Sequence, residues 1–232
     1  MSDKTPLVSV LVFTYNSAPF ILETLESIKH QTYANLELIV SDDHSADETV
    51  QLTREWMTKN SHLFSRSELI TVEKNTRTSS NLNRGLKAAT GEWIKFIAGD
   101  DFLFPNCIEE FVKEVNANPE IDFLFSNMAV NGQETITKEL VHFFSLNSQE
   151  QYKTLLKNSI LPAPANFIRR EVFFQLNYFD ERYGLFDDFP FFLKALKEGY
   201  RFYHINKPLA LPVGIRFIVA DFKTGDHQLP YL

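Results

Sequence analysis

The sequence contains a single cysteine, Cys107, among its 232 residues. One thiol cannot form an internal disulfide, and no paired Cys/His spacing indicates a zinc site. No stretch approaches the roughly 18 apolar residues that a membrane-spanning helix needs, and the apolar run near the N-terminus, about six residues long, is too short for a signal peptide. We therefore expect a cytoplasmic protein, with peripheral association at the inner face of the membrane as the alternative location.

Basic residues are fewer than acidic ones. The chain has 23 lysines and arginines against 30 aspartates and glutamates, which gives a formal net charge of −7. This balance disfavours nucleic acid or an anionic membrane as a partner of the whole surface. Hydrophobic residues make up 44% of the sequence, enough for a full globular core. The 22 phenylalanines concentrate after residue 100 and predict a Phe-rich core, with an exposed aromatic face for a lipid or sugar acceptor as the alternative.

Strand and helix patterns alternate through the first hundred residues. Apolar runs predict strands at 8–13, 36–41, 69–72 and 93–97. Helical spacing between them predicts helices at 20–31, 49–59 and 79–89. Residues 45–48, with the sequence SADE, have the form of a capped start for the second of these helices. This order predicts an α/β protein with a mostly parallel sheet and right-handed crossovers.

The pattern loosens after Pro105. Helices are predicted at 105–118, 148–156 and 189–198. Strands are predicted at 122–126, 165–169, 201–205 and 210–219. The sequence contains no repeat, low-complexity tract or linker, so we expect one continuous domain over residues 1–220 and a C-terminal tail over 221–232.

Two acidic pairs come directly after predicted strands. Asp42-Asp43 follows the second strand, and Asp100-Asp101 follows the fourth strand and a small-residue turn. Two like charges at the end of a buried strand are costly unless a cation or hydrogen-bond donors offset them. Ligands of open α/β sheets bind outside the carboxyl ends of the strands, so both pairs point to one cleft. We expect this cleft to hold a ligand rich in hydroxyls and phosphates, with a divalent metal between.

Three segments, taken in order, resemble family 2 glycosyltransferases with the GT-A fold. They read TYNSAPFILETLESIKHQTYANLELIVSDDHSADET, NTRTSSNLNRGLKAATGEWIKFIAGDD and FDERYGLFDDFPFFLKALKEGYRF. The resemblance covers about residues 7–205. It implies a GT-A type α/β fold with a Rossmann-like, mostly parallel central sheet flanked by helices and a variable acceptor-side second half. Residues 1–104 are then the nucleotide-sugar-binding half, and 105–220 the half with the acceptor site and the catalytic base.

The resemblance also implies the activity. It indicates transfer of a sugar from a nucleoside-diphosphate donor, UDP-linked by expectation, to a hydroxyl of a glycan or lipid-linked acceptor in bacterial surface polysaccharide synthesis. The reaction inverts the anomeric centre and uses Mn²⁺ or Mg²⁺ as the cofactor. These hard ions prefer oxygen ligands and often take only one or two carboxylates, with phosphate and water completing the coordination.

Roles in donor binding follow from the same resemblance. Asp43 matches the residue that recognises the base, and Asp42 lies beside it. The turn at Thr14, Tyr15 and Asn16 is expected to pack around base and ribose. The alternative for the Asp42-Asp43 pair is an ordinary turn followed by a helix cap.

The second acidic pair stands where the family has its DxD-like metal motif. Asp101 is the expected metal ligand, and Asp100 is expected to contact the ribose or to support the ligand. A solvated turn before Pro105 is the alternative. A late histidine, His204 or His227, is available as a further metal ligand, although neither matches a specific motif.

The segment NTRTSSNLNRG resembles a conserved glycine- and asparagine-rich stretch of the family. Arg77 stands where glycine is usual and Asn81 where alanine is usual, whereas Asn83 and Gly85 match. Arg77 and Asn83 are therefore expected to contact the nucleotide sugar, Arg77 through the diphosphate. A surface arginine is the alternative for Arg77.

Asp188 aligns with the family's catalytic base, and Asp187 with the acidic residue before it. Inverting transfer needs a base that removes the proton of the acceptor hydroxyl, and a carboxylate at the start of a helix is rigidly placed for this. An ordinary helix cap is the alternative for this pair.

Two other functions remain open at this point. A nucleotidyltransferase shares the α/β start and the acidic metal ligands, but usually opens with a glycine-rich phosphate loop. The corresponding stretch here, TYNSAPF, contains no glycine. A non-catalytic module that binds a nucleotide sugar is the second alternative.

Overall fold

The computed structural model describes residues 4–130, 133–134, 137–157, 160–161, 163–184 and 188–211. Its first half alternates strand and helix as the apolar spacing predicts. The strands are β1 (Val8–Thr14), β2 (Leu36–Asp42), β3 (Arg66–Thr71) and β4 (Trp93–Ala98). The helices between them are α1 (Ile21–Lys29), α2 (Thr49–Asn60) and α3 (Arg77–Ala88), with a short 3-10 turn, η1 (Ser61–Leu63), after α2.

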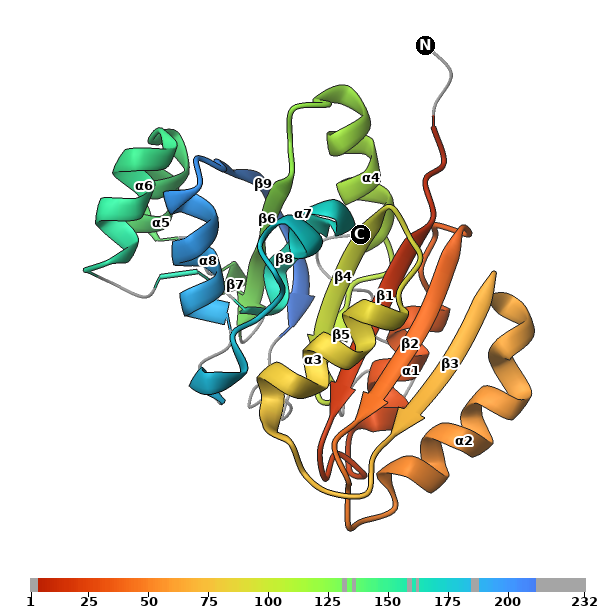
Figure 1. Cartoon of the computed structure of the whole chain (residues 1–232). Coiled ribbons are helices and arrows are strands. Elements are labelled where there is room, and N and C mark those ends of the chain that lie inside the picture. Colours follow the sequence, from red (N-terminus) through yellow and green to blue (C-terminus); the bar gives the residue numbers. More distant parts are fainter. Residues whose placement is uncertain are drawn as a thin grey trace.

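These four strands are all parallel and lie in the order β3-β2-β1-β4 (Figure 1). Every residue of β2 is buried, and β1 is buried except for Phe13, which is partly exposed. Such continuous burial is typical of strands covered on both faces, which is why they read as unbroken apolar runs. Their carboxyl ends meet at one edge of the sheet.

The second half extends the same sheet. Its strands are β5 (Phe102–Leu103), β6 (Phe123–Val130), β7 (Gln133–Glu134), β8 (Asn166–Arg169) and β9 (Phe202–Leu211). Its helices are α4 (Cys107–Ala117), α5 (Lys138–Ser145), α6 (Ser148–Leu155), α7 (Arg170–Gln175) and α8 (Asp188–Lys197), with the 3-10 turns η2 (Ala163–Ala165) and η3 (Glu181–Tyr183). The full order is β3-β2-β1-β4-β8-β6-β9-β5, with β7 paired to β6.

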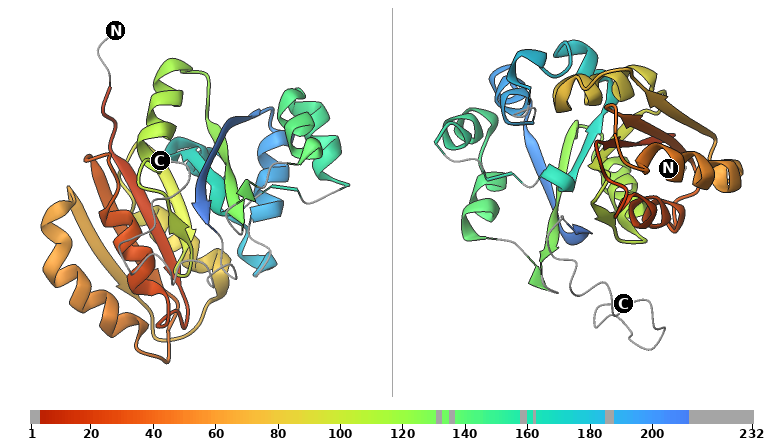
Figure 2. Two further views of the ribbon diagram at one scale, coloured as in Figure 1. Left: turned by 180° about the vertical axis from the view of Figure 1, so that it is seen from behind. Right: turned by 90° about the horizontal axis from the view of Figure 1, so that it is seen from below.

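β8 is antiparallel to both of its neighbours, β4 and β6, whereas β6 and β9 are parallel. β6 and β9 therefore run in the same direction as β1 and β4, and their carboxyl ends lie at the same edge of the sheet. The sheet separates two core clusters (Figure 2). Residues of α1, α2 and α4 pack on one face, and residues of α3 and α5 to α8 on the other.

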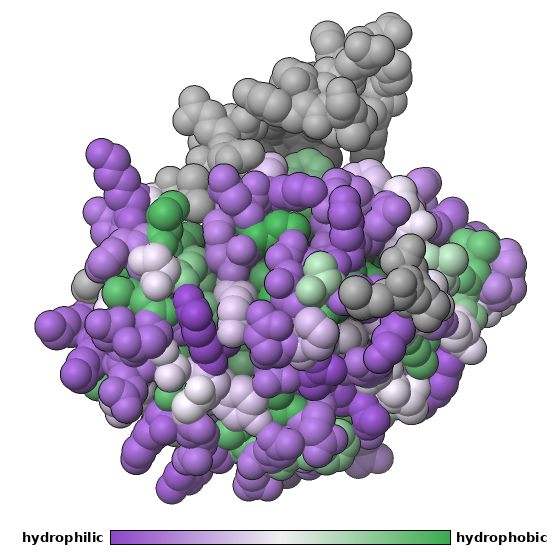
Figure 3. Space-filling view, turned by 90° about the horizontal axis from the view of Figure 1, so that it is seen from above, coloured by the Kyte–Doolittle hydropathy of each residue, from purple (hydrophilic) through white to green (hydrophobic). Residues whose placement is uncertain are grey.

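The second of these cores is aromatic. Phe123, Phe125, Phe192 and Phe202 are fully buried and contact one another with ring centroids 4.6 to 6.4 Å apart. The prediction of a Phe-rich core is confirmed for these residues, although Phe174 is 45% exposed. On the face shown in Figure 3, apolar side chains are scattered among polar ones. Within the described residues, no helix combines the length and the apolar character needed to cross a membrane.

Several details differ from the sequence prediction. Helices α5 and α7 were not expected, and the strands predicted at 201–205 and 210–219 are one strand, β9, up to Leu211; residues 212–219 lie outside the described part. The capped start predicted at 45–48 is wrong, because Ser45 Oγ donates to Asp42 instead. Asp47 accepts a hydrogen bond from Thr49 N at 3.0 Å and so supports the start of α2 in place of a capping box.

Candidate functional site

A cavity of about 550 Å³ opens at the carboxyl ends of β1, β2 and β4. Its wall comes from the residues that end these strands and from the start of α3, and includes Thr14, Tyr15, Asp43, Arg77, Asn81 and Asp100. Because β1 lies between β2 and β4, the two acidic pairs flank it on either side, about 10 Å apart at normal strand spacing. The parallel sheet therefore brings Asp43 and Asp100 to one cavity.

Asp42 is buried behind this cavity and is 1% exposed. Its carboxylate accepts hydrogen bonds from Thr14 Oγ1 at 2.8 Å and from Ser45 N at 2.9 Å. Asp42 therefore fastens the end of β1 to the turn that follows β2. Thr14 is buried by the same contact, at 2% exposure.

Asp43 accepts four hydrogen bonds at the N-terminus of α3. Thr76 N and Arg77 N lie 2.8 and 2.6 Å from Oδ2. Thr76 Oγ1 and Arg84 Nη2 lie 2.6 and 2.7 Å from Oδ1. A carboxylate has about four acceptor positions, so all of them are taken. A ligand that is to hydrogen-bond Asp43 must take the place of one of these donors.

The two carboxylates after β4 have different surroundings. Asp100 lines the cavity and is partly exposed. Asp101 is only 6% exposed, and its Oδ2 accepts a hydrogen bond from Ala98 N at 3.2 Å. Beneath the pair lies Lys95, which is fully buried and donates to Pro164 O. Burial lowers the pKa of Lys95 to about 8, against the opposing effect of the nearby Asp101 carboxylate.

The donor set of this edge fits a divalent ion held jointly with a ligand. Within the described residues, no group of three or more His, Cys, Asp or Glu side chains is clustered to hold an ion alone. Mg²⁺ and Mn²⁺ bind through one or two carboxylates when phosphate and water supply the other ligands. Asp100, which faces the cavity, offers such a carboxylate.

His204 has a protein partner in the structure. Its Nε2 lies 2.6 Å from Asn127 Oδ1, and its ring is stacked on Phe144 at a centroid distance of 4.7 Å. Burial lowers the pKa of His204 to about 4, which keeps the imidazole neutral. The other late histidine that the sequence offered, His227, lies outside the described residues.

The turn after β1 is held by Asn16. Its φ of 51° lies in the left-handed region that asparagine tolerates. Asn16 N donates to Ser45 Oγ and Asn16 Oδ1 accepts from Ala46 N, both at 2.8 Å. The side chain is thus engaged with the loop after β2, whereas Tyr15 beside it is 53% exposed on the cavity wall.

Arg77 occupies a backbone position suited to glycine. Its φ is 73°, which L-residues with a Cβ rarely adopt. This explains why the family resemblance places a glycine there. The side chain is exposed, lines the cavity and passes close to Gly184, where an added Cβ would lie 3.2 Å from Arg77 Cδ.

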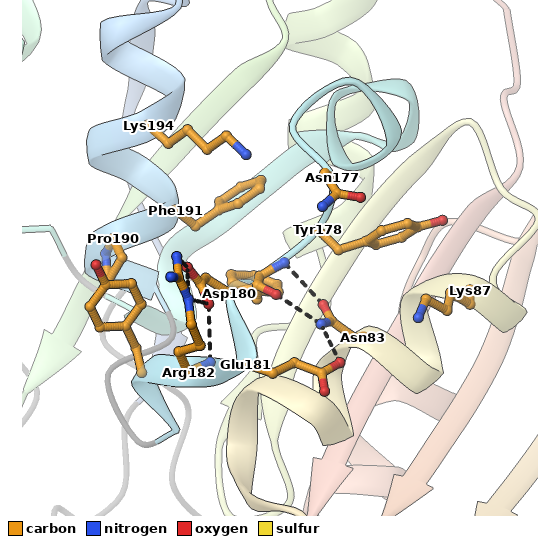
Figure 4. Close-up of a pocket in the computed structure, with 12 residues that line it drawn as sticks. Asn83, Lys87, Asn177, Tyr178, Asp180, Glu181, Arg182, Pro190, Phe191 and Lys194 are labelled. Atoms are coloured by element: carbon orange, nitrogen blue, oxygen red, sulfur yellow. Dashed lines mark hydrogen bonds and ion pairs between the residues drawn. The ribbon is translucent and has the colours of Figure 1, made fainter.

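Asn81 and Asn83 point to different partners. Asn81 lines the cavity, donates to Thr14 O at 3.1 Å and accepts from Arg84 Nη2 at 3.1 Å. Asn83 lines a second cavity of about 630 Å³ between α3, the segment 177–184 and α8 (Figure 4). It is 3% exposed and hydrogen-bonds Phe179 and Glu181. The Asn83 amide is thus engaged with the segment before α8, and its predicted contact with the nucleotide sugar stays a prediction.

Asp188 is the first residue of α8, and its Oδ1 accepts a hydrogen bond from Phe189 N at 2.7 Å. Burial raises the pKa of Asp188 above its ordinary value. Four residues from Gly184 span at most about 14 Å of extended chain, and Gly184 contacts Arg77 of the cavity wall. Asp188 therefore lies within about 14 Å of Gly184. Asp187 lies outside the described residues.

Two polar residues of the site were missed by the sequence analysis. Arg84 pairs with Asp43, and the signal for it is an arginine two turns after the start of a helix that follows an acidic pair. Glu181 accepts a hydrogen bond from Asn83, which lies 98 residues earlier in the chain. No local pattern links two positions so far apart.

Comparison with known proteins identifies similar chains. The model of the family described as glycosyl transferase family 2 matches residues 9–176. An uncharacterized glycosyltransferase of Haemophilus influenzae is 27% identical over 207 residues, which cover 88% of this chain and 67% of that protein. The putative glycosyltransferase EpsH of Bacillus subtilis is 34% identical over 132 residues, 57% of this chain and 36% of that protein.

Solved structures share the fold. TarS 1–349 of S. aureus in complex with UDP superposes with a TM-score of 0.72 at 24% identity, over 89% of this chain and 60% of that chain. The mannosyltransferase PcManGT of Pyrobaculum calidifontis, in complex with GDP-Man and Mn²⁺, gives 0.68 at 23% identity, over 91% and 59%. The predicted α/β fold with a mostly parallel, helix-flanked sheet is thus confirmed. The chain spans about 60% of these two solved chains.

Proposed function

Since the chain belongs to glycosyl transferase family 2, we propose that it transfers a sugar from a nucleoside-diphosphate donor to a hydroxyl of a glycan or lipid-linked acceptor. The observation that carries this proposal is the cavity at the carboxyl ends of β1, β2 and β4. It combines a cavity-facing carboxylate, Asp100, with the cationic Arg77. A diphosphate needs both groups: a carboxylate to share a metal, and a positive partner for the phosphate oxygens.

We expect a UDP-linked donor. TarS is solved with UDP and with UDP-GlcNAc, and PcManGT with GDP-Man. The exposed ring of Tyr15 and the backbone around Thr14 offer a surface for base and ribose. Asp43 recognises the nucleobase, and an N–H group of the nucleobase replaces Arg84 as a donor to the Asp43 carboxylate.

We assign the metal-ligand role to Asp100 and a supporting role to Asp101. This reverses the order expected from the sequence, because Asp100 lines the cavity while Asp101 is nearly buried and bonded to Ala98 N. A bound Mn²⁺ or Mg²⁺ would act as a Lewis acid for the departing diphosphate. Asp101 keeps the turn closed so that Asp100 faces the ligand.

Asp188 acts as the base. Its carboxylate takes the proton of the acceptor hydroxyl as that oxygen forms a bond to the anomeric carbon, and the bond from this carbon to the diphosphate breaks on the opposite side. Such a single displacement inverts the centre. The raised pKa of Asp188 brings this carboxylate closer to the pKa of an effective proton acceptor at neutral pH. We propose Asp187 as the acidic neighbour of the base.

The proposal is tested by donor turnover. The protein is incubated with UDP-, GDP-, CMP- and TDP-sugars, each with Mn²⁺ or with EDTA, and nucleotide release is measured with and without glycan acceptors. Metal-dependent release from one donor class, lost in Asp188→Asn, is expected. Tight nucleotide binding without release from any donor would instead identify a non-catalytic binding module.

A further inference from the structure

Helix α3 is hydrogen-bonded to the segment that leads to α8. Asn83 Nδ2 donates to Phe179 O at 2.9 Å, and Asn83 Oδ1 accepts from Phe179 N at 3.0 Å. The Glu181 carboxylate accepts from Asn83 Nδ2 at 3.0 Å and from Ser80 Oγ at 2.8 Å. Figure 4 shows Asn83 on α3 and Glu181 on this segment facing each other. We call this set of contacts the α3 latch.

The latch ends on the helix that carries the proposed base. Phe179 is 2% exposed, and its ring packs against that of Phe191 at a centroid distance of 4.6 Å. Phe191 belongs to the first turn of α8, three residues after Asp188. Since Asn83 holds the backbone of Phe179 from both sides, the position of this ring is set from α3. A shift of Phe179 would therefore move the start of α8.

The first turn of α3 forms part of the wall of the cavity at the ends of β1, β2 and β4, which we call the donor cavity. Asp43 accepts hydrogen bonds from the amides at the start of α3 and forms an ion pair with Arg84. Ser79 N and Oγ donate to Gly184 O at 3.2 and 3.1 Å, beside the Arg77 side chain. One helix thus contacts both the donor cavity and the segment before the base.

We propose that Asn83 and Glu181 are positioning residues that couple donor binding to the placement of Asp188. The inference rests on the proposed function, in which Asp188 is the base. Neither side chain needs to touch the donor, because Asn83 acts through Phe179 and Glu181 acts through Asn83. Glu181 stays ionised for this purpose: hydrogen bonds from Asn83 and Ser80 hold its pKa below the ordinary value.

The test compares two neighbouring carboxylates. Glu181→Ala removes the latch contacts of that side chain, whereas Asp180→Ala, the matched control, removes contacts to Arg182 within the segment itself. Small displacements of a catalytic group typically cost up to about 100-fold in rate. We expect kcat of Glu181→Ala to fall about 10- to 100-fold, with the Kd for UDP within twofold of wild type. Asp180→Ala should change neither value more than twofold, and Glu181→Gln, which keeps one acceptor, should recover most of the rate.

Hydrogen exchange gives a second readout. Saturating UDP with Mn²⁺ should slow amide exchange in residues 177–184 of the wild type, and this protection should be absent in Glu181→Ala. If Glu181→Ala does not fold, Ser80→Ala removes one latch bond and should lower kcat severalfold. Wild-type kcat in the latch variants, or a loss confined to UDP affinity, would overturn the inference. A wild type that binds no nucleotide would count against the proposed function, whereas full turnover of Glu181→Ala in a UDP-binding enzyme counts against the latch alone.

Discussion

Arg84 Nη2 forms an ion pair with Asp43 Oδ1 at 2.7 Å, and Asp43 lines the cavity proposed to bind the donor. Asp43 is 3% exposed at its side chain and Arg84 23% exposed, so the pair is shielded from water. It holds α3 against the end of β2 in the free protein. Arg84 also occupies the carboxylate of Asp43, which is proposed to bind the nucleobase.

Asp43→Ala should weaken UDP binding and lower the free energy of unfolding by about 2 kcal/mol, because it leaves Arg84 and the first amides of α3 without their acceptor. The affinity that remains should still depend on Mn²⁺, since Asp100 is unchanged. Arg84→Met should lower stability but not UDP affinity, because the carboxylate becomes available to the base. Calorimetric titration of UDP and chemical denaturation measure both effects. Equal losses of UDP affinity in the two variants would contradict the proposed exchange of partners.

Arg77→Gly should separate the effect of the Arg77 charge on UDP affinity from the effect of its backbone strain on stability. Glycine adopts a φ of 73° freely, whereas a residue with a Cβ pays about 1 kcal/mol or more there. Arg77→Ala is the matched control, because it removes the same charge and keeps the strain. We expect both variants to lose UDP affinity equally, and the glycine variant to melt at the higher temperature. Unchanged UDP affinity in both would show that Arg77 is an ordinary surface arginine.

Metal dependence should distinguish the two carboxylates after β4. Asp100→Asn is expected to bind UDP with the same affinity in Mn²⁺ and in EDTA. Asp101→Asn should keep the metal effect and lose stability instead, because its side chain is nearly buried and bonded to Ala98 N. Titration calorimetry with each metal condition gives the comparison. The reverse pattern would return the ligand role to Asp101, as the sequence resemblance implies.

Asp188→Asn should turn over about 10²- to 10⁴-fold more slowly and bind UDP as the wild type does. Activity of the wild type should fall as pH falls through the pKa of Asp188, because the base must be deprotonated. Burial raises this pKa, so the loss should begin at higher pH than for an exposed aspartate. NMR of the product should show a β linkage from an α-linked donor. An α product would exclude the single displacement.

Lys95 should make stability depend on pH. Its pKa is about 8 in the folded protein, against an ordinary value of 10.5. Between these values the unfolded chain holds a proton that the folded protein has released, so the free energy of unfolding rises with pH. The contribution of Lys95 to this rise is on the order of 3 kcal/mol. Lys95→Met should abolish it, which denaturation at pH 7 to 10.5 can show. Burial raises the pKa of Cys107 to about 12, so this thiol lowers the free energy of unfolding as pH rises at high pH. The effect is present in both the wild type and Lys95→Met.

The sequence predicted those parts of the fold that depend on local periodicity. The apolar runs of β1, β2 and β4 and the helical spacing of α3 and α8 leave a clear pattern. The meeting of two acidic pairs followed from parallel topology alone. Helix α7 was missed because its six residues make fewer than two turns, and α5 was missed although α6, of the same length, was predicted.

The sequence could not show how the acidic pairs divide their roles. Adjacent residues point in different directions, and only the turn geometry decides that Asp100 lines the cavity while Asp101 is nearly buried. The partners of Asn83 were equally hidden, because Glu181 lies 98 residues away. The fold determines both results through contacts that no local motif encodes.

β9 lies between β6 and β5 in the sheet and pairs with both. Phe102 pairs with Leu211, more than 100 residues later in the sequence, so closing this contact requires almost the whole described chain. Until β9 docks, β6 and β5 present unpaired backbone groups beside the aromatic core. Open edges of this kind recruit other strands. A chain that stops short of residue 202 would therefore expose unpaired strand edges. Because of this strand order, such a chain is expected to self-associate.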